Sequence, residues 1–193
     1  MISILFVAKN SVYKTMTDSA GEPLDCWDEE RDAMKWPGGN PIVAHPPCRL
    51  FSALSHMSSA PVEEKRLAYW AVDQVRQYGG VLEHPARSKL WRDEILPLPG
   101  ESDQWGISVS LPQFWFNHPG MKWTWLYICG ATFNDLPTVP MRLGFPEDVF
   151  AGGSRKYVPG SRHGGIRSAT PPDFARWLVQ VAERCSKPVE AGK

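Results

Sequence analysis

The sequence lacks long apolar runs and any excess of charge of one sign. No stretch approaches the roughly 18 consecutive apolar residues that a membrane-spanning helix requires, so we expect no membrane association. The 21 basic residues balance the 21 acidic ones, and the formal net charge is zero. No global field therefore draws the protein toward nucleic acid, and any contact with a polyanion must be local.

The sequence also lacks an export signal and a paired cysteine spacing. The first ten residues, MISILFVAKN, have no charged start, and their apolar run is too short for a signal sequence. The cysteines, Cys26, Cys48, Cys129 and Cys185, are widely scattered. We therefore expect reduced thiols and a cytoplasmic protein.

The length and composition of the chain fit one globular domain. The 193 residues are 42% hydrophobic and 22% charged, which is ordinary for a folded protein of single-domain size. We expect one domain over residues 1–185 and a flexible tail over 186–193, without internal repeats. Nine tryptophans indicate either stacking surfaces or a Trp-rich core.

One βαβ unit is readable from the pattern. Residues 41–44 form a short apolar strand, residues 62–78 carry apolar positions at helical spacing, and residues 81–83 form a second strand. Such a unit joins parallel neighbours, whose carboxyl ends meet at one edge of the sheet. Cys48 follows the first strand and Glu83 ends the second, so both should project into one crevice.

The remaining elements predict an α/β fold with a mostly parallel sheet flanked by helices. Residues 2–8, 24–27 and 122–130 are expected to be strands. A final helix should start with Thr170 as N-cap and Pro171 at its first position.

Four short motifs appear in a recognisable order. They are AHPPC at 44–48, EHP at 83–85, GMKWTWLYICG at 120–130, and RLGFPED at 142–148 followed by TPPDFA at 170–175. Together they resemble the cytosine-C5 DNA methyltransferase family, particularly its small phage-type relatives, over roughly residues 41–180. The resemblance implies a trimmed, Rossmann-like methyltransferase domain acting in a bacterial host or phage-infected cell.

The resemblance also implies catalytic roles. Cys48 would be the nucleophile that adds to C6 of cytosine, and Glu83 would contact N3 and the exocyclic amine. His84 stands where the family has asparagine, and Lys122 and Thr124 stand where arginines are usual.

The implied cofactor is S-adenosylmethionine. The positions that would bind it are Phe6, Ala8, Asp28, Pro46, Thr170 and Pro171. The sequence departs from the family here, because the loop after the first strand, FVAKNSVYK, contains no glycine.

The implied partner is DNA or a nucleotide base. Candidate contacts to nucleic acid are Arg49, Ser52, Arg155, Lys156, Arg162 and Arg167, four of which lie in a glycine-rich basic segment over 152–167. Between Gly130 and Met141 there is no room for a target-recognition insert, so we expect low sequence specificity. Reaching a base in a duplex requires flipping it out, and the candidates for stacking on it are Phe51, Trp115, Trp123 and Trp125.

The chemistry requires two perturbed groups. A thiol with an ordinary pKa near 8.5 is mostly protonated at neutral pH, so the site must stabilise the thiolate, for example by a helix N-terminus or by a nearby cation, for which Arg49 and His45 are candidates. Burial is expected to raise the pKa of Glu83, so that this residue can neutralise the charge that develops as sulfur adds.

Three other hypotheses remain open. The same Cys48 adduct could react with an electrophile other than a methyl donor. Alternatively, His45, Cys48, His84 and His118 could bind a metal ion. A non-catalytic module that binds nucleic acid or a protein is the third, and the missing glycine loop favours it.

Overall fold

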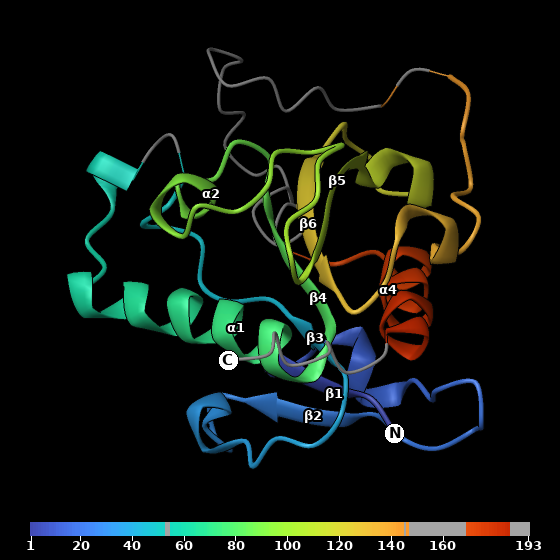
Figure 1. Ribbon diagram of the computed structural model, residues 1–193, viewed down its shortest axis with the longest axis horizontal. Helices are drawn as coiled ribbons and strands as arrows, with labels where there is room; N and C mark the ends of the chain where they lie inside the picture. Colours follow the sequence, from blue (N-terminus) through green and yellow to red (C-terminus); the bar gives the residue numbers. More distant parts are fainter. Residues whose placement is uncertain (53–54, 145, 147–168, 186–193) are drawn as a thin grey trace, which may run out of the picture.

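The computed structural model describes residues 1–52, 55–144, 146 and 169–185. The strands of this part form one six-stranded sheet in the order β2-β1-β3-β4-β6-β5 (Figure 1). The strands are β1 (Ser3–Val7), β2 (Asp25–Asp28), β3 (Ile42–Ala44), β4 (Gly80–Pro85), β5 (Gly106–Pro112) and β6 (Trp123–Cys129).

The sheet is mixed: three of its five strand pairs are parallel, in line with the expectation of a mostly parallel sheet, and the other two are antiparallel. The pairs β1/β2, β1/β3 and β3/β4 are parallel, whereas β6 runs antiparallel to both β4 and β5. The reason is the connection from β5 to β6, which contains only the short 3-10 helix η5 (Gln113–Phe116). A parallel pair needs a longer crossover, usually through an α-helix. The α/β class itself is confirmed.

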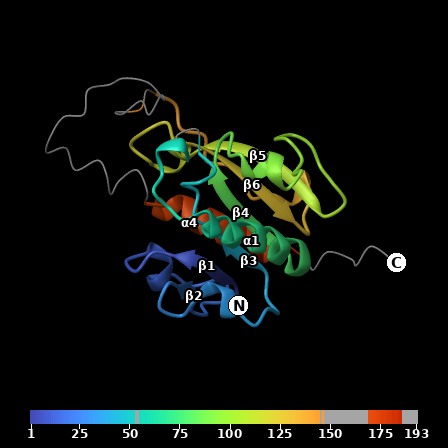
Figure 2. The ribbon, with the colours of Figure 1, turned by 90° about the vertical axis from the view of Figure 1, so that its left-hand side faces the viewer.

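Two helices cover opposite faces of the sheet (Figures 1 and 2). The first, α1 (Lys65–Tyr78), buries Ala68, Ala71, Val72 and Val75. The other, α4 (Pro172–Arg184), buries an aromatic and aliphatic stripe that includes Phe174 and Leu178. The sheet therefore separates two hydrophobic cores, here called the α1 side and the α4 side.

Short helices complete the described chain. They are α2 (Leu90–Asp93) and the 3-10 helices η1 (Val12–Thr15), η2 (Ala33–Lys35), η3 (Ser55–Met57), η4 (Val62–Glu64) and η6 (Phe133–Asp135). The first turn of the helix expected over 62–78 is thus η4, and α1 follows it directly.

The turn from α1 into β4 depends on glycine. Gly79 caps α1 with a φ of 80°, and Gly80 follows with a φ of 120°. A Cβ at Gly80 would lie 2.0 Å from the Ile42 carbonyl oxygen. Any other residue would therefore separate β3 from β4, the two strands that carry the predicted site.

The start of α4 differs by one position from the prediction. Pro171 is the N-cap and Pro172 the first helical residue, so Thr170 lies before the helix. Proline suits both positions, because the N-cap is extended and the first helical N–H has no partner in the helix.

Some predictions lie outside the described residues. They concern residues 145, 147 and 148 of the 142–148 motif and the tail over 186–193. They also concern the basic segment with Arg155, Lys156, Arg162 and Arg167. Within the described ranges, no helix has the length and apolarity needed to cross a membrane.

Candidate active site

The period of two along the strands brings the site together on the α4 side. Val81 packs on the α4 side and Leu82 on the α1 side, so Glu83 returns to the α4 side. The same alternation after Val43 directs His45 to that side, and Thr124 shares it with Leu126 on β6. Three polar side chains from three adjacent strands or their ends therefore converge.

A cleft of about 880 Å³ opens at this edge of the sheet. Cys48 and Glu83 both line it, as the parallel order of β3 and β4 predicts. Its described wall consists of Phe6, Val7, Ala8, Asn10, Ser11, Val12, Tyr13, His45, Pro46, Pro47, Cys48, Glu83, His84, Pro85, Lys122, Ala169 and Thr170. The volume is that of a small-molecule site.

Glu83 accepts hydrogen bonds on both carboxylate oxygens. His45 Nδ1 lies 3.1 Å from Oε2, and Gln113 Nε2 lies 3.3 Å from Oε1. The Thr124 hydroxyl also contacts Oε1 and lies 2.9 Å from the His84 carbonyl oxygen. The carboxylate is held from both sides, and its side chain is only 11% exposed.

The charge state of Glu83 is the opposite of the expected one. Burial acts to raise the pKa, but the hydrogen bond from His45 and the nearby charge of Lys122 outweigh it and lower the pKa of Glu83 to about 2. Glu83 is therefore an ionised acceptor at neutral pH and not a neutral acid.

His45 connects Glu83 to a buried phenol. Its Nε2 lies 2.9 Å from the Tyr13 hydroxyl, and Tyr13 is 1% exposed. Burial and the charge of Glu83 raise the pKa of Tyr13 well above its ordinary value, so the side chain stays a phenol. Both ring nitrogens of His45 are thus engaged.

The His84 ring packs toward the α1 side, although the residue also lines the cleft, and its predicted catalytic role stays a prediction. The side chain is fully buried, with the ring against Phe51. Nε2 lies 3.2 Å from the Pro46 carbonyl oxygen and Nδ1 lies 2.8 Å from the Ser88 hydroxyl. Because a carbonyl only accepts, Nε2 carries the proton and Nδ1 accepts from Ser88. Burial lowers the pKa of His84 to about 4, so this neutral ring anchors the loop that carries Cys48.

The thiol of Cys48 is protonated at neutral pH. Burial and the Glu83 carboxylate raise its pKa, against a smaller lowering by Lys122. The two expected cations do not pair with it: Arg49 binds both carboxylate oxygens of Glu64 at 2.7 Å, and His45 binds its own partners. A group that removes the thiol proton is therefore needed before sulfur can act as a nucleophile.

The expected cofactor residues divide into two sets. Phe6, Ala8, Pro46 and Thr170 line the cleft, whereas Asp28 and Pro171 do not. Asp28 accepts from the backbone N–H groups of Glu30 and Arg31 and pairs with Lys14. Its carboxylate closes a turn after β2, and this explains its burial without a ligand.

Phe6 has an unusual backbone conformation. Its φ is 62°, in the left-handed region, and the register of β1 shifts between Leu5 and Val7. Because of the bulge, the Phe6 side chain points to the α1 side, as that of Leu5 does. Its ring packs edge-on against Trp70, and the two ring centroids are 5.9 Å apart. Such strain concentrates at functional sites, and Phe6 lines the cleft.

The other expected nucleic-acid contacts receive little support among the described residues. Arg49 is neutralised by Glu64, and Ser52 donates its backbone N–H to the Cys48 carbonyl and is absent from the cleft wall. Of the aromatic candidates, Phe51 is fully buried and Trp115 and Trp125 pack against the cores. Only Trp123 is substantially exposed, at 48%.

The metal hypothesis does not fit the described part of the chain. No three His, Cys, Asp or Glu side chains there are arranged to hold a metal ion. His84 points to the α1 side, and His118 is buried with Nδ1 beside the Gly120 carbonyl. The four proposed ligands therefore do not converge.

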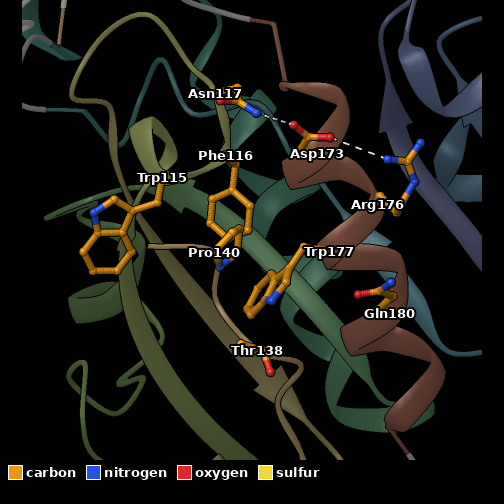
Figure 3. A pocket seen from close by; sticks show the side chains of 9 residues that line it. All are labelled: Trp115, Phe116, Asn117, Thr138, Pro140, Asp173, Arg176, Trp177 and Gln180. Carbon is orange, nitrogen blue, oxygen red and sulfur yellow. Dashed lines mark hydrogen bonds and ion pairs between the residues drawn. The ribbon is translucent and has the colours of Figure 1, made fainter. Parts of the chain in front are cut away.

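A second, smaller hollow of about 300 Å³ lies between η5 and α4 (Figure 3). Trp115, Phe116 and Trp177 line it, and Asp173 there accepts from Asn117 at 2.6 Å and pairs with Arg176. It contains no cysteine, histidine or lysine, so none of the predicted catalytic residues lines it.

Two residues of the larger site had no sequence motif. Tyr13 lies on η1, within the segment FVAKNSVYK that stands where the family has its cofactor loop, but the resemblance assigned this side chain no role. Gln113 follows β5, and its backbone N–H donates to the Lys122 carbonyl. A prediction that the segment before residue 122 pairs with the 122–130 strand would have placed Gln113 near the site.

The chain matches no protein-family model, and no curated protein and no solved structure shows significant similarity to it. Evidence for a function therefore comes from the site itself.

Proposed function

We propose that the protein modifies a pyrimidine base, with cytosine as the preferred one, through covalent addition of Cys48 to C6 of the ring. The observation that carries this proposal is that a thiol and an ionised carboxylate line one open cleft of small-molecule size. A flat heterocycle between them would meet a nucleophile at one edge and a hydrogen-bond acceptor at another.

The addition activates an otherwise unreactive carbon. Cytosine C5 is a poor nucleophile until sulfur adds at C6, which moves the double-bond electrons toward C4 and N3 and leaves an enamine. The enamine carbon C5 can then take an electrophile or a proton, and loss of a proton from C5 together with the thiolate from C6 re-forms the C5–C6 double bond and restores the ring.

The residues around Glu83 support base recognition. An ionised carboxylate accepts hydrogen bonds, so it suits the exocyclic amine of cytosine and disfavours the carbonyl oxygen that uracil has there. Thr124, Gln113 and His45 fix its orientation. Lys122 lines the same cleft and adds a positive charge.

The described residues do not fit S-adenosylmethionine. Its ribose hydroxyls and ammonium group call for a carboxylate, and Glu83 is the one carboxylate in the described wall of the cleft. Asp28, the expected ribose partner, is already bound by Lys14 and by two backbone N–H groups. We therefore propose activation of C5 and derive no methyl-transfer step.

A 5-azacytosine adduct tests the proposal without any donor. The ring nitrogen at position 5 takes a proton after sulfur adds, so the adduct persists. We expect the intact mass of the protein to increase by the mass of one substrate molecule with 5-azacytidine monophosphate, with a single-stranded 5-azacytosine oligonucleotide, or with both. The two substrates distinguish a nucleotide enzyme from a DNA enzyme.

Two variants make the result specific. Cys48→Ser should give no adduct. Cys26→Ser is the matched control, because Cys26 is also a partly exposed free thiol but lies outside the cleft wall, and it should behave like wild type. If wild type forms no adduct with either substrate, the cleft belongs to a non-catalytic module and the proposal is wrong.

A further inference from the structure

One buried side-chain atom in the described part of the chain has no hydrogen-bond partner, and it belongs to a residue that holds Glu83. The atom is Oε1 of Gln113, the first residue of η5, whose side chain is fully buried. Buried polar groups are almost always paired, so such an atom requires an explanation. The other end of the same amide offers one, because its Nε2 donates to Glu83 Oε1 at 3.3 Å.

The direction of the Gln113 amide follows from its two ends. The backbone is fixed on both sides, since the Gln113 N–H donates to the Lys122 carbonyl at 2.8 Å and the Gln113 carbonyl accepts from the His118 N–H at 3.2 Å. A half-turn of the side-chain amide would place its oxygen against the Glu83 carboxylate and leave two N–H donors unpaired. Two unpaired donors are less favourable than one unpaired carbonyl. The donor therefore stays directed at Glu83.

The other groups around Glu83 hold it in a different way. The Thr124 hydroxyl contacts Oε1 and also lies 2.9 Å from the His84 carbonyl oxygen. A hydroxyl has one proton, so it can donate to only one of these two acceptors at a time. His45 binds the other carboxylate oxygen, Oε2. Gln113 is thus the donor to Oε1 that has no second acceptor among the described residues.

These contacts leave little of the carboxylate for a ligand. An ionised carboxylate has about four acceptor positions, and Gln113, Thr124 and His45 each face one of them. The remaining position is on Oε2, and Glu83 lines the cleft. Its direction depends on the plane of the carboxylate, because rotation of the group moves both oxygens together. A donor fixed on Oε1 therefore also sets the direction in which Oε2 accepts.

We propose that Gln113 is a positioning residue for base recognition, which holds Oε1 of Glu83 so that Oε2 accepts a hydrogen bond from the amino group at C4 of the base. This inference rests on the proposed function. Gln113 lies outside the cleft wall and outside the recognised sequence motifs, so it acts on the base through Glu83. The unpaired Oε1 of its amide is the cost of directing Nε2 at the carboxylate.

Binding to Cys48→Ser tests this role without adduct formation. Calorimetry compares cytidine monophosphate with its pyrimidin-2-one analogue, which lacks only the amino group at C4, and single-stranded oligonucleotides with either base at one position extend the comparison to DNA. We expect the cytosine form to bind about 10-fold more tightly or better, which is the effect of one hydrogen bond to a charged group. In Cys48→Ser with Gln113→Met, this preference should fall several-fold, because methionine has the length of glutamine but no donor.

Gln77→Met is the matched control, because the same change there falls on an exposed residue of α1 and should leave the preference as it is. Urea denaturation shows whether Gln113→Met is folded, and Gln113→Leu is the second donor-free variant. An unchanged or larger preference in a folded variant, or equal binding of both forms to Cys48→Ser, refutes the role of Gln113. The proposed function stands in that case as long as the wild type forms the 5-azacytosine adduct, and it is the absence of that adduct that would refute the function.

Discussion

The ionised state of Glu83 makes a quantitative prediction about stability. The pKa of this carboxyl falls from an ordinary value of 4.5 to about 2 in the folded protein. Each pKa unit corresponds to about 1.4 kcal/mol, so the ionised form contributes about 3 kcal/mol to the free energy of unfolding. Because the folded pKa is the lower one, this contribution is complete above pH 4.5 and is lost as the pH falls toward 2.

Glu83→Gln is the perturbation that isolates this contribution. Glutamine keeps the shape and one acceptor oxygen, so His45 can still donate to it, but the charge that faces His45 and Lys122 is gone. We expect the variant to be less stable than wild type by about 3 kcal/mol at neutral pH and by almost nothing near pH 2.

The assay is urea denaturation of both proteins over a series of pH values. Other carboxyls with lowered pKa values, such as Asp25 and Asp28, also destabilise the fold in acid, and taking the difference between the two proteins removes their effect. A difference that is independent of pH, or a variant more stable than wild type at neutral pH, would show that Glu83 is not held as a carboxylate and would refute the reasoning.

The remaining predictions concern four positions. Phe6→Gly should be more stable than Phe6→Ala by about 1 kcal/mol, despite the smaller side chain, because glycine tolerates the φ of 62°; equal urea midpoints would contradict the strain. Alkylation of Cys48 by iodoacetamide, followed by peptide mass spectrometry, should be slow at neutral pH and should still accelerate where an ordinary thiol has levelled off, because burial raises the pKa of this thiol; a rate that levels off as for a free cysteine would contradict this. His84→Ala should abolish adduct formation in a folded protein by releasing the Pro46 carbonyl, and wild-type rates would disprove the anchoring role. Arg49→Ala should leave the urea midpoint close to that of wild type, because its pair with Glu64 is exposed on the arginine side, and a clearly lower midpoint would argue against this.

The sequence was sufficient for the part of the site that depends on strand periodicity. The parallel order of β3 and β4 and the position of Cys48 after a strand placed the thiol and Glu83 at one edge, and the structure has both in one cleft. Both inferences use only local pattern and the handedness of βαβ units, which hold with little dependence on the rest of the chain.

What could not be predicted depends on contacts between distant segments. The sequence cannot show that Lys14 forms a salt bridge with Asp28 or that Glu64 forms one with Arg49, because these pairs form only after folding. The low pKa of Glu83 likewise results from His45 and Lys122 on neighbouring strands, whereas burial alone predicts a rise. The strand β5 was not predicted, although Ile107, Val109 and Leu111 alternate with two serines in the period of a strand, and a glycine and a proline bound the segment.

The division of β4 between its two faces has a consequence for mutation. Glu83 and His84 are adjacent, yet Glu83 faces the cleft of the proposed reaction, whereas His84 contacts the loop that carries Cys48 from the α1 side. Inserting or deleting a single residue between Gly80 and Glu83 would exchange their faces, burying a charge against Phe51 and releasing the loop. Length changes in this strand should thus be tolerated far less than most substitutions. The site forms only when β4 pairs with its neighbours in the register seen here.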